Sequence, residues 1–300
     1  MVPPQDDSTA RYPGSDWDAV QAAAKGGERT PAFLLVLGRH AHLPSERKLA
    51  AFAEALNLDA FTARQWLLSP TPRVIRRESR HDRVLEWTEW MRGLGIRAFD
   101  LSEQLLAEQE FHTPPVLFPD GRHWRLYYDD GRQEILAPED IACAVWGEVQ
   151  ERFQTETTTA AIGGEIIAGR TKTLHAELML DLHRHLSPIS VRIAQDAVRW
   201  SAINPDETTQ SSLRMRRMLD KFRPWLRDID IAEDFSRAEP VLGATREILS
   251  NSSYLQTKWL GAGGRLRLHR EKSIRESSRE TFCIYSSLIR WEHLRLGRVK

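Results

Sequence analysis

In the first third of the chain, short apolar runs typical of strands alternate with segments whose apolar residues recur at helical spacing. The short apolar runs AFLLVLG, RVIRR and IRAFDL are typical of strands. Between them, three segments have apolar residues at helical spacing, which predicts three helices. Pro44 favours the first turn of one helix, Asp59 the N-cap of the next, and Ser79-x-x-Asp82 a capping box for the third. The predicted order over residues 31–105 is therefore strand, helix, helix, strand, helix, strand.

One string in this region carries a resemblance: FLLVLG…KLAAFAEALNLDAFTARQWLLSPTPRVI…VLEWTEWMRGLGIRAF. Its features are the first strand, the connection into the second helix at Leu56 to Ala63, the Pro-x-Val start of a strand at 72–74 and the G-x-G-I motif near its end. In these features residues 32–100 resemble the C-terminal domain of the ribosomal stalk protein, whose fold the Clp protease adaptor shares. Both relatives bind other proteins, so the resemblance implies a small docking module. The segment EALNLDAFTARQ lacks the glycines and the lysine pattern of the stalk family, so only the fold is carried over.

From residue 115 onward apolar and polar residues alternate, which is the period of half-buried strands. GRHWRLYYDDGRQEILAP predicts a hairpin around Asp129-Asp130-Gly131. IACAVWGEVQERFQT also has the composition of a strand, although Pro138-Glu139-Asp140 before it is compatible with a helix start. TETTTAAIGGEIIAGRTKT is small, polar and interrupted by glycines, which favours a mobile connection.

The stretch HAELMLDLHRH, residues 175–185, presents a choice between a strand and a metal site. Its apolar and polar residues occupy alternate positions, as a half-buried antiparallel strand requires. Residues at i and i+2 of a strand can also share a metal ion, and the candidate ligands are His175, Glu177, His183 and His185. Of these, His183 and His185 form an i, i+2 histidine pair, but a catalytic zinc needs a third protein ligand, and the sequence does not indicate which residue would join that pair. We therefore favour the strand and keep a metal-dependent hydrolase as an alternative.

Two further helices complete the predicted α+β fold. After Asn204-Pro205-Asp206, apolar residues at helical spacing predict an amphipathic helix, and a closing helix is predicted from residue 278. Successive strands closed by one helix suggest a pleckstrin-homology-like arrangement. The predicted division is a flexible leader at 1–30, a docking domain at 31–105, a mainly antiparallel β domain with its closing helix at 112–235, and a basic C-terminal extension packing on that domain at 240–300.

Composition excludes several classes of protein. An apolar content of 41% with ten Trp and ten Phe is enough for hydrophobic cores. No apolar run approaches the roughly 20 residues that cross a bilayer, so we expect no membrane insertion. The first residues lack an export signal, and Cys143 and Cys283 form no CxxC pair. These features predict a cytoplasmic protein of bacterial type.

Charge is balanced over the whole chain but segregated within it. Residues 99–160 carry thirteen acidic residues against four arginines, and residues 258–300 carry eleven basic residues against four glutamates. Blocks of opposite sign can pair within the fold or between subunits. Residues considered for surface contacts are Arg73, Arg76, Arg77, Arg80, Arg83, Trp90, Arg265, Arg267 and Arg270. For the run from Arg73 to Arg83, a solvated strand edge is the alternative to phosphate or partner binding.

The sequence contains no Walker motif, G-x-S-x-G elbow, H-E-x-x-H or kinase signature. We therefore expect a non-catalytic protein without a cofactor that acts as an adaptor or regulatory scaffold by binding another protein or itself. The alternative is a nucleic-acid-binding protein that uses the Arg73 to Arg83 run or the basic C-terminal segment, with Trp259 or Trp291 for stacking.

Overall fold

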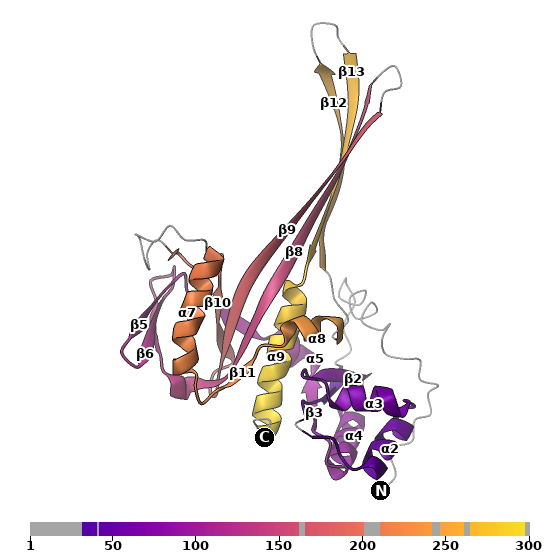
Figure 1. The fold of residues 1–300 in the computed structure, drawn as a ribbon, viewed down its shortest axis with the longest axis vertical. Helices are drawn as coiled ribbons and strands as arrows, with labels where there is room; N and C mark the ends of the chain where they lie inside the picture. Colours follow the sequence, from indigo (N-terminus) through magenta and orange to yellow (C-terminus); the bar gives the residue numbers. More distant parts are fainter. Residues whose placement is uncertain are drawn as a thin grey trace.

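The computed structural model describes residues 32–40, 42–161, 166–200, 211–241, 247–260 and 265–297. The predicted leader at 1–30 lies outside these residues. The described chain contains helices and three mainly antiparallel sheets, which confirms the α+β class. Figure 1 shows a body of helices and strands from which a long, narrow ribbon of strands projects.

The N-terminal domain has the predicted order of elements. Its strands are β1 (Phe33–Leu37), β2 (Arg73–Glu78) and β3 (Ala98–Ser102), and its helices are α2 (Glu46–Ala55), α3 (Ala60–Leu67) and α4 (His81–Gly93). β1 lies between β2 and β3 and is antiparallel to both. Leu35 and Leu37 of β1 pack with Phe52 of α2 and Met91 of α4 on one face of this sheet. Hydrophobic periodicity was therefore sufficient to predict this domain.

The two caps predicted in the N-terminal domain have different outcomes. Asp59 caps α3, because its Oδ1 accepts the backbone N–H groups of Phe61 and Thr62 at 2.9 Å each. The capping box predicted from Ser79 is wrong, since α4 begins at His81 and has no side-chain cap. Asp82 instead binds the Arg80 guanidinium, with 3.1 Å between Arg80 Nε and Asp82 Oδ1.

Two long hairpins form the largest sheet. β8 (Ile141–Ala161) pairs with β9 (Ile166–Arg184), and β12 (Glu247–Leu260) pairs with β13 (Arg265–Ser277). β13 also pairs with β8, so the hairpins lie edge to edge in the order β12-β13-β8-β9. Near the body, β10 (Ile189–Ala194) and then β4 (Glu110–His112) continue the sheet beside β9. β11 (Asp230–Ala232) lies parallel to β8 on the opposite side.

The mobile connection predicted at 155–173 is wrong for the described residues of that segment. They form the outer halves of β8 and β9 and pair in continuous register from Thr155↔Thr171 to Ala160↔Ile166. Threonine is β-branched and favours extended backbone, and β13 supplies a further pairing partner from a distant part of the sequence. Small polar composition therefore indicated exposure and not a loop.

A third sheet and α7 (Ser211–Trp225) cover one side of the body. The sheet is a meander of β5 (Val116–Asp120), β6 (His123–Tyr127) and β7 (Gln133–Leu136), and the hairpin predicted at Gly131 joins the last two strands. The 3-10 turn η1 (Pro138–Asp140) then leads into β8. Trp124 of β6 stacks on Phe222 of α7 with 3.8 Å between ring centroids. The amphipathic helix predicted here is confirmed, whereas a pleckstrin-homology-like arrangement stays a prediction.

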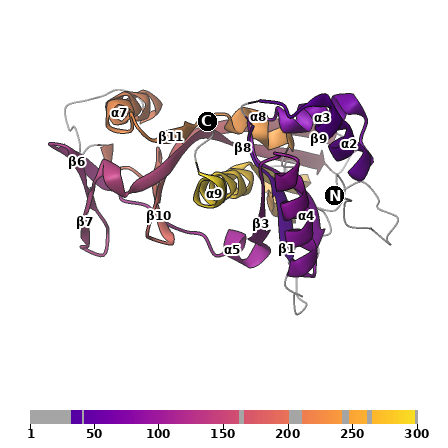
Figure 2. The ribbon, with the colours of Figure 1, turned by 90° about the horizontal axis from the view of Figure 1, so that it is seen from below.

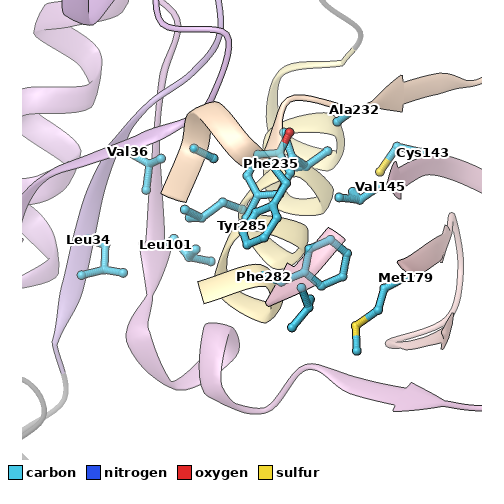
Figure 3. Packing of buried hydrophobic residues seen from close by; sticks show 14 of the residues in the cluster. Leu34, Val36, Leu101, Cys143, Val145, Met179, Ala232, Phe235, Phe282 and Tyr285 are labelled. Atoms are coloured by element: carbon cyan, nitrogen blue, oxygen red, sulfur yellow. The ribbon is translucent and has the colours of Figure 1, made fainter. Parts of the chain in front are cut away.

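The closing helix α9 (Arg279–Leu296) is confirmed and forms the centre of the body. Figure 2 shows it between the N-terminal domain and the larger sheet, with the short helices α5 (Glu103–Ala107) and α8 (Phe235–Val241) nearby. Its buried Phe282 and Tyr285 lie among apolar residues of both parts (Figure 3). The cluster around α9 includes Leu34, Val36 and Leu101 of the N-terminal sheet and Val145 and Met179 of the larger one.

β9 is a strand, as the alternation in HAELMLDLHRH predicted, but it is buried on both faces near the body. Leu178, Leu180 and Leu182 pack in the cluster with α7, while Met179 packs in the cluster with α9. Asp181 and His183 have no exposed surface. The expectation of a half-buried strand is therefore wrong for this half of β9, because α9 covers the polar face.

Candidate functional site

The outer part of the two hairpins projects beyond the body, as Figure 1 shows. We call it the arm and define it as residues 152–161, 166–174, 248–260 and 265–276, which lie beyond the cross-strand pair of Glu151 and Ser277. Ten residues of β8 in the arm correspond to roughly 33 Å of extended strand. The arm therefore presents backbone and side chains far from the cores of the body.

The described side chains of the arm belong to no hydrophobic core. Those at 152–158 of β8 and 168–174 of β9 are all exposed or half-buried. The clusters of buried apolar residues end at Val149 on β8 and at Leu178 on β9. Leu174 keeps 60% of its surface exposed. Backbone pairing between strands therefore holds the arm together, which suits a sheet whose faces are free for contacts.

Polar groups anchor the base of the arm to α9. Ser278, at the start of α9, accepts a hydrogen bond from the backbone N–H of Gln150 through its Oγ at 2.9 Å. The backbone N–H of Ser278 donates to the carbonyl oxygen of Gln150 at 3.0 Å. Arg279 forms an ion pair with the buried Glu177 and lies 3.9 Å from Glu151. Burial raises the pKa of Glu177, while the Arg279 charge acts in the opposite direction.

The structure does not bring the four candidate metal ligands together. His175 binds Asp196 at 2.7 Å, Glu177 pairs with Arg279, and His185 lies beside His293 with 6.1 Å between ring centroids. His183 is bound on both ring nitrogens by the hydroxyls of Ser190 and Ser286, at 2.7 and 2.9 Å. Among the described residues, no group of three or more His, Cys, Asp or Glu is placed to hold a metal ion.

His183, Asp181 and Ser286 form a buried network that differs from a catalytic triad. Ser286 donates to Asp181 Oδ2 at 2.5 Å, and Arg192 binds both oxygens of the same carboxylate at 2.7 Å each. In a triad the carboxylate orients the histidine, whereas here serines bind both ring nitrogens. Ser286 has no exposed surface to meet a substrate. The network instead fixes α9 on the polar face of β9.

The Arg73 to Arg83 run is largely neutralised by its neighbours. Four of its arginines bind carboxylates, and Arg73 lies over the Trp66 ring at 4.8 Å. The four pairs are Arg76–Glu78, Arg77–Glu103, Arg80–Asp82 and Arg83–Glu86. Phosphate binding would have to compete with these pairs, so the run matches the solvated edge better than a nucleic-acid site.

Of the other residues considered for surface contacts, one is buried in the N-terminal domain and three lie on the arm. Trp90 is 4% exposed and packs edge-on against Trp87, so it is a core residue and not a surface contact. Arg265, Arg267 and Arg270 lie on β13 in the arm, where Arg267 pairs with both Lys258 and Ala161. The sequence did not predict the arm, although the β-branched run of threonines at 155–159 was a signal for strand.

The acidic and basic blocks of the sequence meet in the fold. β13, from the basic block, runs beside β8, from the acidic block, and the backbone of Lys272 lies opposite that of Glu156. Arg295 of α9 lies 4.0 Å from Asp100 of β3. These contacts support the interpretation that the blocks pair within the fold. Within the described part of the chain, no helix is long and apolar enough to cross a membrane.

A comparison with protein-family models found no match for this chain, and comparisons with curated proteins and with solved structures found none either.

Proposed function

We propose that this chain is a non-catalytic protein-interaction module, an adaptor or scaffold of a bacterial-type cytosol, and that the arm is its binding element. The observation that carries the proposal is the projection of the arm from a body whose hydrophobic clusters, among the described side chains, end before the arm begins. The described side chains of the arm add nothing to these clusters, so we attribute the length of the arm to contacts with a partner.

Strand pairing is the mode of binding that suits this element. An exposed sheet edge can accept a further strand, because main-chain N–H and C=O groups provide affinity and alternate side chains provide specificity. The arm offers two such edges, β12 on one side and the outer part of β9 on the other, since β10 pairs only with residues 179–182 of β9. Exposed loops do not offer a continuous backbone ladder of this length.

The alternative functions have weaker support. A metal-dependent hydrolase would require His175, Glu177, His183 and His185 to converge, and each has a separate partner. A nucleic-acid-binding function through Arg73 to Arg83 would require cations that are now paired with carboxylates. Protein binding through the arm is therefore better supported than metal-dependent hydrolysis or nucleic-acid binding.

Shortening the arm across one cross-strand row tests the proposal. Asn251, Ile274, Gln154 and Lys172 form such a row. Replacing residues 155–171 and residues 252–273 each by Asn-Gly closes both hairpins just beyond it with a favoured turn. We expect the shortened chain to unfold at nearly the same temperature as the full chain, because no described residue of the hydrophobic clusters is removed.

The two chains are then compared as baits for proteins from the cells that make this protein. We expect specific partners to be retained by the full chain and lost by the shortened one. The proposal is wrong if the shortened chain, still folded by circular dichroism, retains the same partners in the same amounts. It is also wrong if the full chain retains none.

A further inference from the structure

β12 is the outermost strand of the arm, and its free edge has an unusual composition. Within the described residues, no strand pairs with the side of β12 that faces away from β13. Ten consecutive positions, residues 248–257 with the sequence ILSNSSYLQT, contain no charged residue, no proline and no glycine. Such a strand offers its backbone groups to another strand with none of the residues that normally prevent pairing.

The other strands of the arm show that charge is not scarce in this region. β13, the inner neighbour of β12, has seven charged residues among its 13 positions. The opposite edge, β9, carries Arg170 and Lys172. Proteins usually place charges on edge strands, where they discourage association. In this arm an inner strand is charged and one edge is not, which is the distribution expected if β12 is an inner strand of an assembled sheet.

We infer that β12 pairs antiparallel with β12 of a second copy of this chain, about a two-fold axis that passes through the edge of the arm. The inference deepens the proposed function, on which it rests, by naming a partner for the arm. Two-fold pairing brings each residue opposite a residue of the same strand, and like charges placed opposite one another are destabilising. A run of ten uncharged residues avoids that cost wherever the axis lies within it.

The charges at the two ends of β12 favour one position of the axis. An axis at Ser253 brings Lys258 of each copy opposite Glu247 of the other, because Leu249 is bulged out of the register of β12 with β13 and does not count as a pairing position. Opposite charges then meet at both ends of the uncharged run. The other edge lacks this property, because an axis at Thr171 of β9 would place Arg170 of one copy opposite Lys172 of the other. The charge pattern therefore selects β12 for self-pairing.

A matched pair of substitutions tests which edge is used. Ser252, Ser273, Thr155 and Thr171 form one cross-strand row, so Ser252→Lys and Thr171→Lys add the same charge in the same row at opposite edges. We expect the full chain to form dimers in sedimentation-velocity experiments. Ser252→Lys should weaken self-association about tenfold, since it adds like charges near the two-fold axis, and Thr171→Lys should leave it unchanged.

Mixing two variants separates self-pairing from other effects of substitution. Ser252→Lys and Ser252→Glu should each dimerise weakly, whereas an equimolar mixture should recover dimers that contain one copy of each. Only direct contact between β12 strands of two copies predicts this recovery. A full chain that remains monomeric, equal weakening by Ser252→Lys and Thr171→Lys, or a mixture no stronger than its components would overturn the inference.

The inference and the proposed function fail in different ways. A monomeric chain that still loses its protein partners when the arm is shortened contradicts only self-pairing. A chain that dimerises through β12 but retains the same other partners without the arm contradicts the assignment of partner binding to the arm and leaves self-pairing intact.

Discussion

His183 is fully buried, and both its ring nitrogens are bound by serine hydroxyls. Burial lowers the pKa of His183 to about 3 from an ordinary value of 6.5, so the folded chain holds it neutral. Between these two values the unfolded chain binds a proton that the folded chain does not. The contribution of His183 to the free energy of unfolding is therefore fully present above its ordinary pKa and decreases as the pH falls below that value.

The predicted effect of His183 at pH 5 is a loss of about 2 kcal/mol in the free energy of unfolding relative to neutral pH. His183→Gln should lower stability at neutral pH, because it disturbs the buried network, but should remove this part of the pH dependence. Urea denaturation of both chains at pH 7 and pH 5 measures the difference. His123→Asn, at an exposed histidine outside this network, is the control substitution. Parallel pH profiles for the His183→Gln and wild-type chains would contradict the assignment.

Gly147 of β8 allows α9 and α8 to approach the sheet closely. A Cβ added there would lie 2.7 Å from Phe282 Cε2 and 3.0 Å from Phe235 Cβ. Both phenylalanines are buried in the cluster around α9, so neither ring can move away into solvent. We expect Gly147→Ala to cost about 1–3 kcal/mol through overpacking, measured by chemical denaturation. In a Phe282→Leu background the same substitution should cost less, and an equal cost in both backgrounds would contradict the steric explanation.

At the scale of elements, local sequence signals predict the helices and turns that are held by local interactions. Helices α2, α3 and α4 each have their own apolar period, and Asp59 marks the start of α3 by a hydrogen bond to residues two and three positions later. The hairpin at Gly131 depends on a positive φ of 82°, which glycine adopts readily. For such elements, the residues that determine the structure are neighbours in the sequence.

Elements that depend on distant residues were predicted incompletely. The alternation in β9 indicated a strand, but Ser286, which binds both Asp181 and His183, comes from a helix about a hundred residues later. The small, polar composition of outer β8 favours a connection, although this part pairs with β9 in a local hairpin and with β13 from a distant part of the sequence. Burial of the β9 polar face and the four-stranded arm depend on these long-range pairings. Hydrophobic periodicity does not show which distant segments pair.

At the scale of the whole molecule, Arg39 joins the N-terminal domain to α9 and to the larger sheet. Its Nε binds Glu292 of α9 at 2.6 Å, and its Nη2 binds Asp230 of β11 at 2.7 Å. Burial alone would lower the pKa of Arg39, but the charges of Glu292 and Asp230 outweigh it, and the pKa lies above its ordinary value. Gly38 allows this approach, because a Cβ there would lie 2.9 Å from Glu292 Oε1.

Removing Arg39 should therefore leave Glu292 as a buried carboxylate without its main partner. Burial already raises the pKa of Glu292, and Arg39 is the principal charge that opposes this effect. We expect Arg39→Met to lower the free energy of unfolding by about 3 kcal/mol at neutral pH. A carboxyl whose folded-state pKa is raised stabilises the fold below its unfolded pKa and loses that contribution as the pH rises, so the defect should be smaller at pH 5 than at pH 8.

The double variant Arg39→Met/Glu292→Gln distinguishes loss of an ion pair from loss of packing. Glutamine carries no charge and still accepts the backbone N–H of Arg39, which binds Glu292 Oε1 in the native chain. We expect the double variant to be more stable than Arg39→Met alone in guanidinium denaturation at pH 8, because the buried charge is gone. If the two substitutions instead add, α9 and the N-terminal domain are joined by apolar contact around Leu34, Val36 and Tyr285, and the ion pair contributes little to their association.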